Sequence, residues 1–110
     1  MLYSQKQLDN LLVQFSAMLQ KNISVKEMYL FGSYLTGKSH INSDIDIAVI
    51  SDEFQGQRFF DRQKLNNIII SKTYPELDFI DIEVHPFKTE NFNESDPLAE
   101  EILKTGKRIL

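Results

Sequence analysis

The fold is decided by residues 32–49, which read GSYLTGKSHINSDIDIAV. This segment holds two features: a Gly32-Ser33 pair and, after ten intervening residues, Asp44 and Asp46 one residue apart. Apolar runs lie before the first feature and after the second. We therefore expect the Gly-Ser pair to follow one buried strand and the two aspartates to begin another.

The Gly-Ser pair follows residues 28–31 (MYLF), a stretch that is apolar and too short for a helix. It predicts a buried strand that ends at Gly32. Gly32 allows a close approach of the backbone or a positive φ, and Ser33 is expected to cap a short helical turn over residues 34–36. Because a helix N-terminus presents N–H groups to an anion, this turn is a candidate phosphate-binding site.

The aspartates open a second predicted strand over residues 44–50. Alternate side chains of a strand share a face, so Asp44 and Asp46 point the same way while Ile45 and Ile47 enter the core. Two residues of strand separate such carboxylates by about 6–7 Å, which suits Mg²⁺ held by carboxylates and substrate phosphates. A Ser-Asp pair is also common in ordinary turns. A turn does not explain Asp46, however, because this residue lies within the predicted strand and strands disfavour Asp.

A third carboxylate is needed if two metal ions are to hold a displaced phosphate in line. Residues 77–85 (LDFIDIEVH) read as a third strand, with Asp81 and Glu83 on one face and the aliphatic residues, Ile80 included, on the other. On this pattern either acid can complete the set. His85 is not expected to bind the metal, since Mg²⁺ prefers oxygen ligands and no second histidine is near in sequence.

Residues 32–49 resemble the signature of the nucleotidyltransferase superfamily that includes DNA polymerase β. The short chain is similar to its minimal nucleotidyltransferase (MNT) branch, which contains the MntA-type antitoxins. In that family the third acid begins a later strand, written Asp-hydrophobic-x-Val, that is followed by a Thr-x-x-Phe turn. Residues 81–84 (DIEV) and 89–92 (TENF) fit with Asp81 in the acid position, and Glu83 takes its place if the strand is offset by two residues.

One position departs from the family pattern. Many relatives carry a basic residue where this chain has Thr36, which leaves a phosphate contact there in question. Lys38 lies close enough in sequence to substitute for it.

The resemblance implies a Mg²⁺-dependent transfer of AMP from ATP to a hydroxyl acceptor. By that resemblance Asp44, Asp46 and Asp81 are the catalytic and metal-binding acids, and Gly32 and Ser33 hold the phosphates of ATP. In the antitoxin branch the implied acceptor is a tyrosine of a HEPN-type toxin, an RNase with which the chain would form a hetero-oligomer.

Two other functions stay open on the sequence. The first is an antitoxin that acts as a binding module and neutralises its partner by occlusion, with nucleotide transfer weak or lost. The second is a subunit that modifies a small molecule, as in the aminoglycoside nucleotidyltransferases, although those enzymes carry an additional substrate domain.

Composition bounds these expectations. A length of 110 residues suits one domain, residues 1–110, with a single core. The absence of cysteine excludes disulfides and thiolate metal sites. A net charge of −4 with scattered basic residues argues against a long nucleic acid as partner. No signal-peptide or membrane-span pattern is present, so a cytoplasmic location is expected.

Periodicity predicts the remaining elements. Apolar residues at helical spacing follow a capping box at Ser4 and indicate a helix to about Lys21. A second helix is predicted over residues 58–71 with Phe60 and Leu65 among its inward residues. Asp96-Pro97 opens a last helix that Gly106 closes, and residues 107–110 are either a short strand or a frayed tail. The order of elements predicts an α/β domain with a small mixed sheet flanked by helices.

Overall fold

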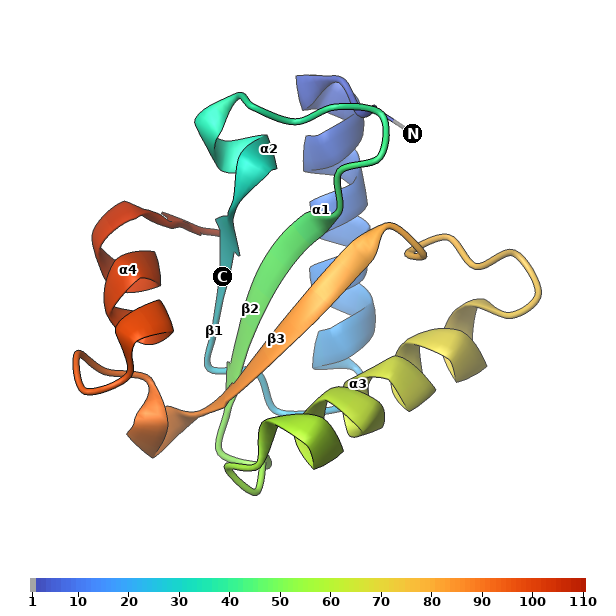
Figure 1. Cartoon of the computed structure of the whole chain (residues 1–110). Helices are drawn as coiled ribbons and strands as arrows, with labels where there is room; N and C mark the ends of the chain where they lie inside the picture. The colour runs from blue at the N-terminus through green and yellow to red at the C-terminus, as the bar shows by residue number, and fades with distance from the viewer. Residues whose placement is uncertain (1) are drawn as a thin grey trace.

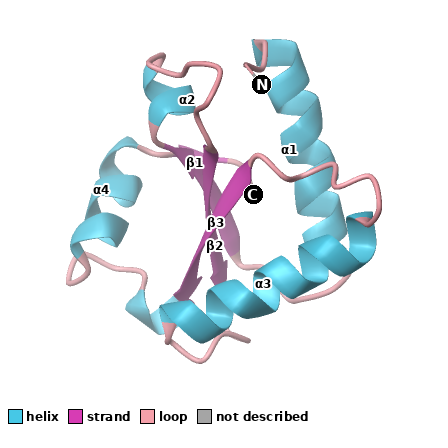
Figure 2. Cartoon of the chain, turned by 45° about the vertical axis from the view of Figure 1, so that its right-hand side comes forward, coloured by secondary structure: helices cyan, strands magenta, loops and turns pink. Residues whose placement is uncertain are grey.

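A β-sheet separates two helical layers in this computed structural model, which describes residues 2–110 (Figures 1 and 2). Its strands are β1 (Glu27–Phe31), β2 (Ile45–Ser51), β3 (Ile82–Lys88) and β4 (Lys107–Arg108). They lie in the order β3-β2-β1-β4, with β1 antiparallel to β2 and β4, and β2 parallel to β3. The mixed sheet confirms the predicted fold class. Because β4 pairs with β1, the end of the chain contains the short strand that was one of its two predicted forms.

The helices are α1 (Gln5–Gln20), α2 (Ser33–Thr36), α3 (Arg58–Thr73) and α4 (Pro97–Thr105), with a 3-10 turn, η1 (Thr89–Asn91), after β3. The predicted capping box starts α1: the side chain of Ser4 accepts from the backbone N–H of Gln7, and the Gln7 side chain accepts from that of Ser4. In the part of the chain that the structure describes, no helix has both the length and the apolar character needed to cross a bilayer.

Each face of the sheet has its own core. One face packs against α1 and α3 through Phe15, Leu65 and the inward residues of β2, of which Ile45 and Ile47 are fully buried as predicted. The other face packs against α4 through a smaller cluster that includes Ile102. In Figure 1, α4 lies beside this face of the sheet and below α2.

Helix α3 differs from its prediction at one inward position. Phe60 is 54 % exposed, and the neighbouring Asp61 is buried in its place. The carboxylate of Asp61 accepts hydrogen bonds from the backbone N–H groups of Gln55 and Gly56, at 2.9 and 3.0 Å. Two bonds to one charged group offset its burial, and they fix the turn that starts the helix.

The third strand begins later than predicted. Residues 77–81 form turns, in which the N–H groups of Leu77, Ile80 and Ile82 donate to carbonyls three or four residues back. These local bonds replace strand pairing, so β3 starts only at Ile82 and runs on through Pro86 to Lys88. The prediction that Ile80 faces the core is therefore wrong, since its side chain is 71 % exposed.

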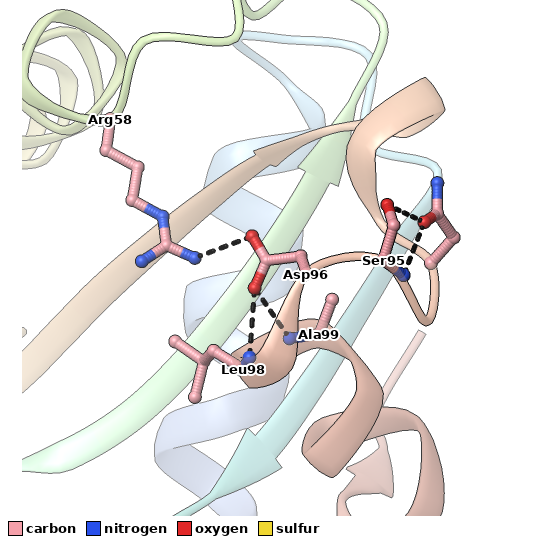
Figure 3. Close-up of polar contacts among 6 residues, drawn as sticks. Arg58, Ser95, Asp96, Leu98 and Ala99 are labelled. Atoms are coloured by element: carbon pink, nitrogen blue, oxygen red, sulfur yellow. Dashed lines mark hydrogen bonds and ion pairs between the residues drawn. The ribbon is translucent and has the colours of Figure 1, made fainter.

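Helix α4 begins as predicted, with Asp96 as N-cap and a proline at its first position (Figure 3). One carboxylate oxygen of Asp96 accepts from the N–H groups of Leu98 and Ala99, while the other accepts from Arg58 of α3 at 3.3 Å. This carboxylate therefore ties the starts of two helices together across the edge of β3.

Candidate active site

Strand register brings three positions into one row across the sheet. Phe31 of β1 lies opposite Asp46 of β2, and Asp46 lies opposite Glu83 of β3. Gly32 follows Phe31 directly, at the point where β1 turns into α2. Side chains on facing positions of neighbouring strands are about 5 Å apart. The row therefore places a glycine turn and two carboxylates side by side.

Both its backbone conformation and its closeness to Asp46 require glycine at position 32. Its φ is +80° and its ψ −155°, a region that only glycine adopts without strain. A β-carbon at this position would lie 2.3 Å from Oδ2 of Asp46. Gly32, and not Ser33 as predicted, is the N-cap of α2, because its positive φ starts the helical turn one residue earlier.

Asp46, Glu83 and His85 form a cluster whose ligand atoms lie within 4.8 Å of one another. Nε2 of His85 is 3.1 Å from Oδ1 of Asp46. The imidazole ring meets the ring of Phe31 edge to face, with 4.9 Å between centroids. Phe31 thus packs against His85, His85 contacts one oxygen of the Asp46 carboxylate, and the missing side chain of Gly32 leaves room for the other.

Glu83 is also paired with Arg62 of α3. The guanidinium donates to Oε1 of Glu83 at 2.8 Å and, through Nε, to the carbonyl oxygen of Val84 at 3.0 Å. This double contact anchors the arginine along the edge of β3. The ion pair is partly exposed, so its favourable energy is small.

Asp44 lies at the border of this cluster. It immediately precedes β2 and lines an open cavity of about 310 Å³ together with Arg62 and Glu83. Among residues 2–110, the acid and histidine side chains that converge within metal-binding distance do not include Asp44. The structure thus places the first predicted aspartate beside the cluster and the second inside it.

Asp81 occupies a different position. It lies in the turn before β3, where its carbonyl accepts from the N–H of Ile45 and its carboxylate accepts from the hydroxyl of Tyr3 at 2.7 Å. Burial and the neighbouring carboxylate raise the pKa of Tyr3 to about 12. Within the described residues Asp81 is not part of the metal-binding cluster. Of the two candidate third acids, Glu83 is the one beside Asp46.

The turn at Gly32 borders a hollow between two helices. A groove of about 440 Å³ lies between α2 and α4, lined by Gly32 and Thr36 on one side and Glu101 and Thr105 on the other. Ser33 begins α2, and its carbonyl accepts from the N–H of Lys38, which closes the turn. Space for a ligand therefore adjoins the first N–H groups of the helix.

The donor set fits a divalent cation. Two carboxylates supply the hard oxygen ligands that Mg²⁺ and Mn²⁺ prefer, and an imidazole adds a nitrogen ligand that suits transition metals. The three side chains are partly exposed, so a substrate oxygen can complete the coordination.

Sequence reasoning set His85 aside and did not single out Arg62. The signal for His85 was present, because it stands two residues after Glu83 and so shares its face of the strand. Arg62 had no such signal. It reaches Glu83 because α3 packs along the edge of β3, a relation between distant segments.

Comparison with known proteins identifies the family. Residues 14–110 match the family described as Polymerase beta, Nucleotidyltransferase. A search of curated proteins found no match.

Solved structures give the same fold. A chain of a toxin–antitoxin complex with AMP-PNP is 27 % identical, with a TM-score of 0.59 over 93 % of this chain and 72 % of that one. A mutant MntA toxin–antitoxin complex is 26 % identical, with a TM-score of 0.58 over 89 % and 70 %. A complex of tri-AMPylated Shewanella oneidensis HEPN toxin with MNT antitoxin, at 23 % identity, has a TM-score of 0.56 over 96 % and 72 %. The chain belongs to the polymerase β nucleotidyltransferase family, and it is a minimal nucleotidyltransferase domain resembling the MntA antitoxins.

Proposed function

We propose that this domain transfers AMP from ATP to a tyrosine hydroxyl of a HEPN-type toxin, in a reaction that depends on Mg²⁺. The observation that carries the proposal is the pairing of Asp46 with Glu83 on neighbouring strands, with Gly32, at the end of β1, packed against the Asp46 carboxylate. It sets two carboxylates beside a turn suited to phosphate, which is what nucleotidyl transfer requires.

Asp46 and Glu83 hold the metal in this proposal, and Asp44 joins them from the border of the cavity. Mg²⁺ bound there would supply positive charge to the triphosphate and lower the pKa of the acceptor hydroxyl. Glu83 takes the role for which the sequence favoured Asp81. Its place beside Asp46 in the register supports this choice, as does the bond of Asp81 to Tyr3.

The chain's own groups position the nucleotide. The Ser33 hydroxyl and the N–H groups at the start of α2 bind the phosphates, and Gly32 lets them come close to Asp46. The groove between α2 and α4 offers room for the rest of the nucleotide. Positioning and electrostatics then carry the rate enhancement.

The transfer itself is one displacement at the α-phosphorus. The acceptor oxygen forms a bond to phosphorus, the bond to the β-phosphate oxygen breaks, and pyrophosphate leaves. Glu83 takes the proton of the acceptor hydroxyl. Arg62 donates a hydrogen bond to this carboxylate at 2.8 Å and so helps to position it at the edge of the site.

The partner is inferred from relatives. A similar chain comes from a toxin–antitoxin complex with AMP-PNP, an ATP analogue, and another from an MntA complex. These likenesses support a toxin as acceptor and an adenine nucleotide as donor for this chain.

Labelled ATP tests the proposal. The purified chain is mixed with a HEPN-type toxin, Mg²⁺ and ATP labelled in the α-phosphate, and mass spectrometry locates the label. We expect AMP on a toxin tyrosine with the wild type and none with Asp46→Asn. A tight complex without label would instead favour the occlusion module, and labelling of an aminoglycoside without labelling of toxin would favour a small-molecule enzyme.

A further inference from the structure

A second hollow adjoins the candidate site on its β3 side. An apolar groove of about 220 Å³ lies between the second half of α3 and residues 77–82. The connection from α3 to β3 forms one wall of it, and this connection is the yellow-to-orange loop in Figure 1. The groove is lined by Asn66, Ile69, Ile70, Thr73, Leu77, Phe79, Ile80 and Ile82.

This groove is continuous with the acidic cavity. Asn66, Ile80 and Ile82 line both hollows, and the cavity is lined further by Asp44, Arg62, Glu83 and Val84. A chain segment in the groove would therefore reach the carboxylates without crossing other parts of the protein.

The order of the strands indicates whether the nucleotide or the acceptor enters the site from the side of β3 and α3. The phosphate turn at Gly32 stands at the end of β1, the metal-binding Asp46 on β2 and Glu83 on β3. An in-line displacement at phosphorus has the leaving group on one side and the nucleophile on the other. Pyrophosphate leaves toward β1 and Ser33, so the acceptor enters from β3 and α3, where the apolar groove lies.

We propose that this groove docks the segment of the acceptor protein that carries the modified tyrosine. The proposal rests on the proposed AMP transfer and names where its protein substrate binds. Apolar side chains next to the tyrosine cover Ile70 and Ile80, which are 52 % and 71 % exposed in this structure.

Charge adds a second requirement on the occupant. Residues 74–81 carry Glu76, Asp78 and Asp81 and no lysine or arginine, and both Glu76 and Asp78 are exposed. Glu76 and Asp78 stand on either side of Leu77, which lines the groove, and acidic residues in this place favour a segment with basic flanks. The occupant is thus a basic, apolar segment with one tyrosine.

A synthetic peptide serves as the probe. It contains about twelve residues, with one tyrosine, leucines at helical spacing and a lysine at each end, and it carries a fluorescent label. Two control peptides replace the leucines by serine or the lysines by glutamate. Binding to the full chain is measured by fluorescence anisotropy, and AMP transfer to the peptide is measured separately with labelled ATP and Mg²⁺.

Matched protein variants locate the binding. Ile70→Asp and Ile80→Asp place a charge in the groove, while Val13→Asp changes an exposed apolar residue on α1, 67 % exposed and away from the groove. All three positions are exposed, so circular dichroism should show the same fold for each. We expect the two groove variants to weaken binding of the leucine–lysine peptide by about tenfold or more, and Val13→Asp to leave it unchanged.

The readouts separate the two proposals. Equal anisotropy for wild type and groove variants, or equal binding of the leucine and serine peptides, overturns the docking groove. Equal AMP transfer by the groove variants overturns it as well, while the proposed function stands. Groove-dependent binding of the peptide, with no AMP transfer to the peptide or to a HEPN-type toxin, keeps the docking surface and removes the proposed activity.

Discussion

The carboxylate of Asp46 occupies the space that a side chain on Gly32 would need. A β-carbon on Gly32 would lie 2.3 Å from Oδ2 and 3.2 Å from the carboxyl carbon of Asp46. The turn that is proposed to hold phosphate and the acid that is proposed to hold metal therefore form one unit. The predictions below follow from this unit and from the residues around it.

Gly32→Ala should destabilise the protein and abolish the effect of nucleotide. The unfavourable φ and ψ alone cost about 1–3 kcal/mol, and the new methyl group must also displace Asp46. Urea unfolding gives the stability, and the rise in Tm on adding Mg²⁺ and ATP gives binding.

The matched control is Gly37→Ala. Gly37 also has a positive φ, +77°, but apart from its own chain neighbours nothing lies within 4 Å of a β-carbon built there. We expect a loss of about 1–2 kcal/mol from the left-handed backbone, with the rise in Tm retained. Loss of that rise in both variants would contradict a special role for the contact with Asp46.

Glu83→Gln and Asp81→Asn distinguish the two candidate third acids. Removing a metal-holding charge forfeits several kcal/mol of transition-state stabilisation, so Glu83→Gln should lower AMP transfer by about a hundredfold or more. Asp81→Asn should keep most of the activity, because its carboxylate binds Tyr3. The measurement is initial rate with labelled ATP, and the opposite ranking would return the role to Asp81.

His85→Gln should weaken metal binding without unfolding the protein. His85 orients Asp46 through a 3.1 Å contact, and loss of such an orienting partner costs about 10- to 100-fold in metal affinity. Calorimetric titration with Mn²⁺ measures the affinity directly. His40, in the loop before β2, provides the control: His40→Gln should leave the Mn²⁺ affinity unchanged.

Tyr3 makes stability depend on alkaline pH. Its pKa is raised to about 12 in the folded protein, chiefly by burial and then by Asp81, whereas the unfolded chain has the ordinary value of 10.0. Between these values the unfolded state loses the proton first, so folding stability falls as pH rises from 10 toward 12.

Tyr3→Phe should flatten this fall, because phenylalanine has no proton to lose. The check is Tm against pH for wild type and variant, together with the ultraviolet titration of tyrosinate. Tyr29, whose pKa is also raised by burial and by Glu27, keeps a late-titrating signal in both proteins. An unchanged slope in the variant would show that Tyr3 does not carry the effect.

Much of this architecture could be predicted from local sequence. Helix α1 and helix α4 begin at Ser4 and Asp96 because their side chains satisfy the first N–H groups, a bond within four residues of chain. The burial of Ile45 and Ile47 follows from strand alternation in the same way. Each of these features is decided by neighbours in the chain.

Other predictions were wrong because a hydrogen bond that the local sequence pattern does not reveal decided the structure. Phe60 fits the helical stripe, but Asp61 is buried because its carboxylate serves Gln55 and Gly56. The turn bonds of residues 77–81 likewise outcompete the strand that their apolar residues suggest.

The sequence by itself determined that a glycine turn would end one strand and that two alternating aspartates would begin the next, since spacing and alternation are properties of one continuous segment. Only the tertiary structure decided which later residues stand beside them. Sheet register is set by how whole strands pack, and a shift of two residues exchanges Asp81 for Glu83 without moving any side chain to the other face. The pairing of Asp46 with Glu83, and the approach of His85 and Arg62, arise from that packing.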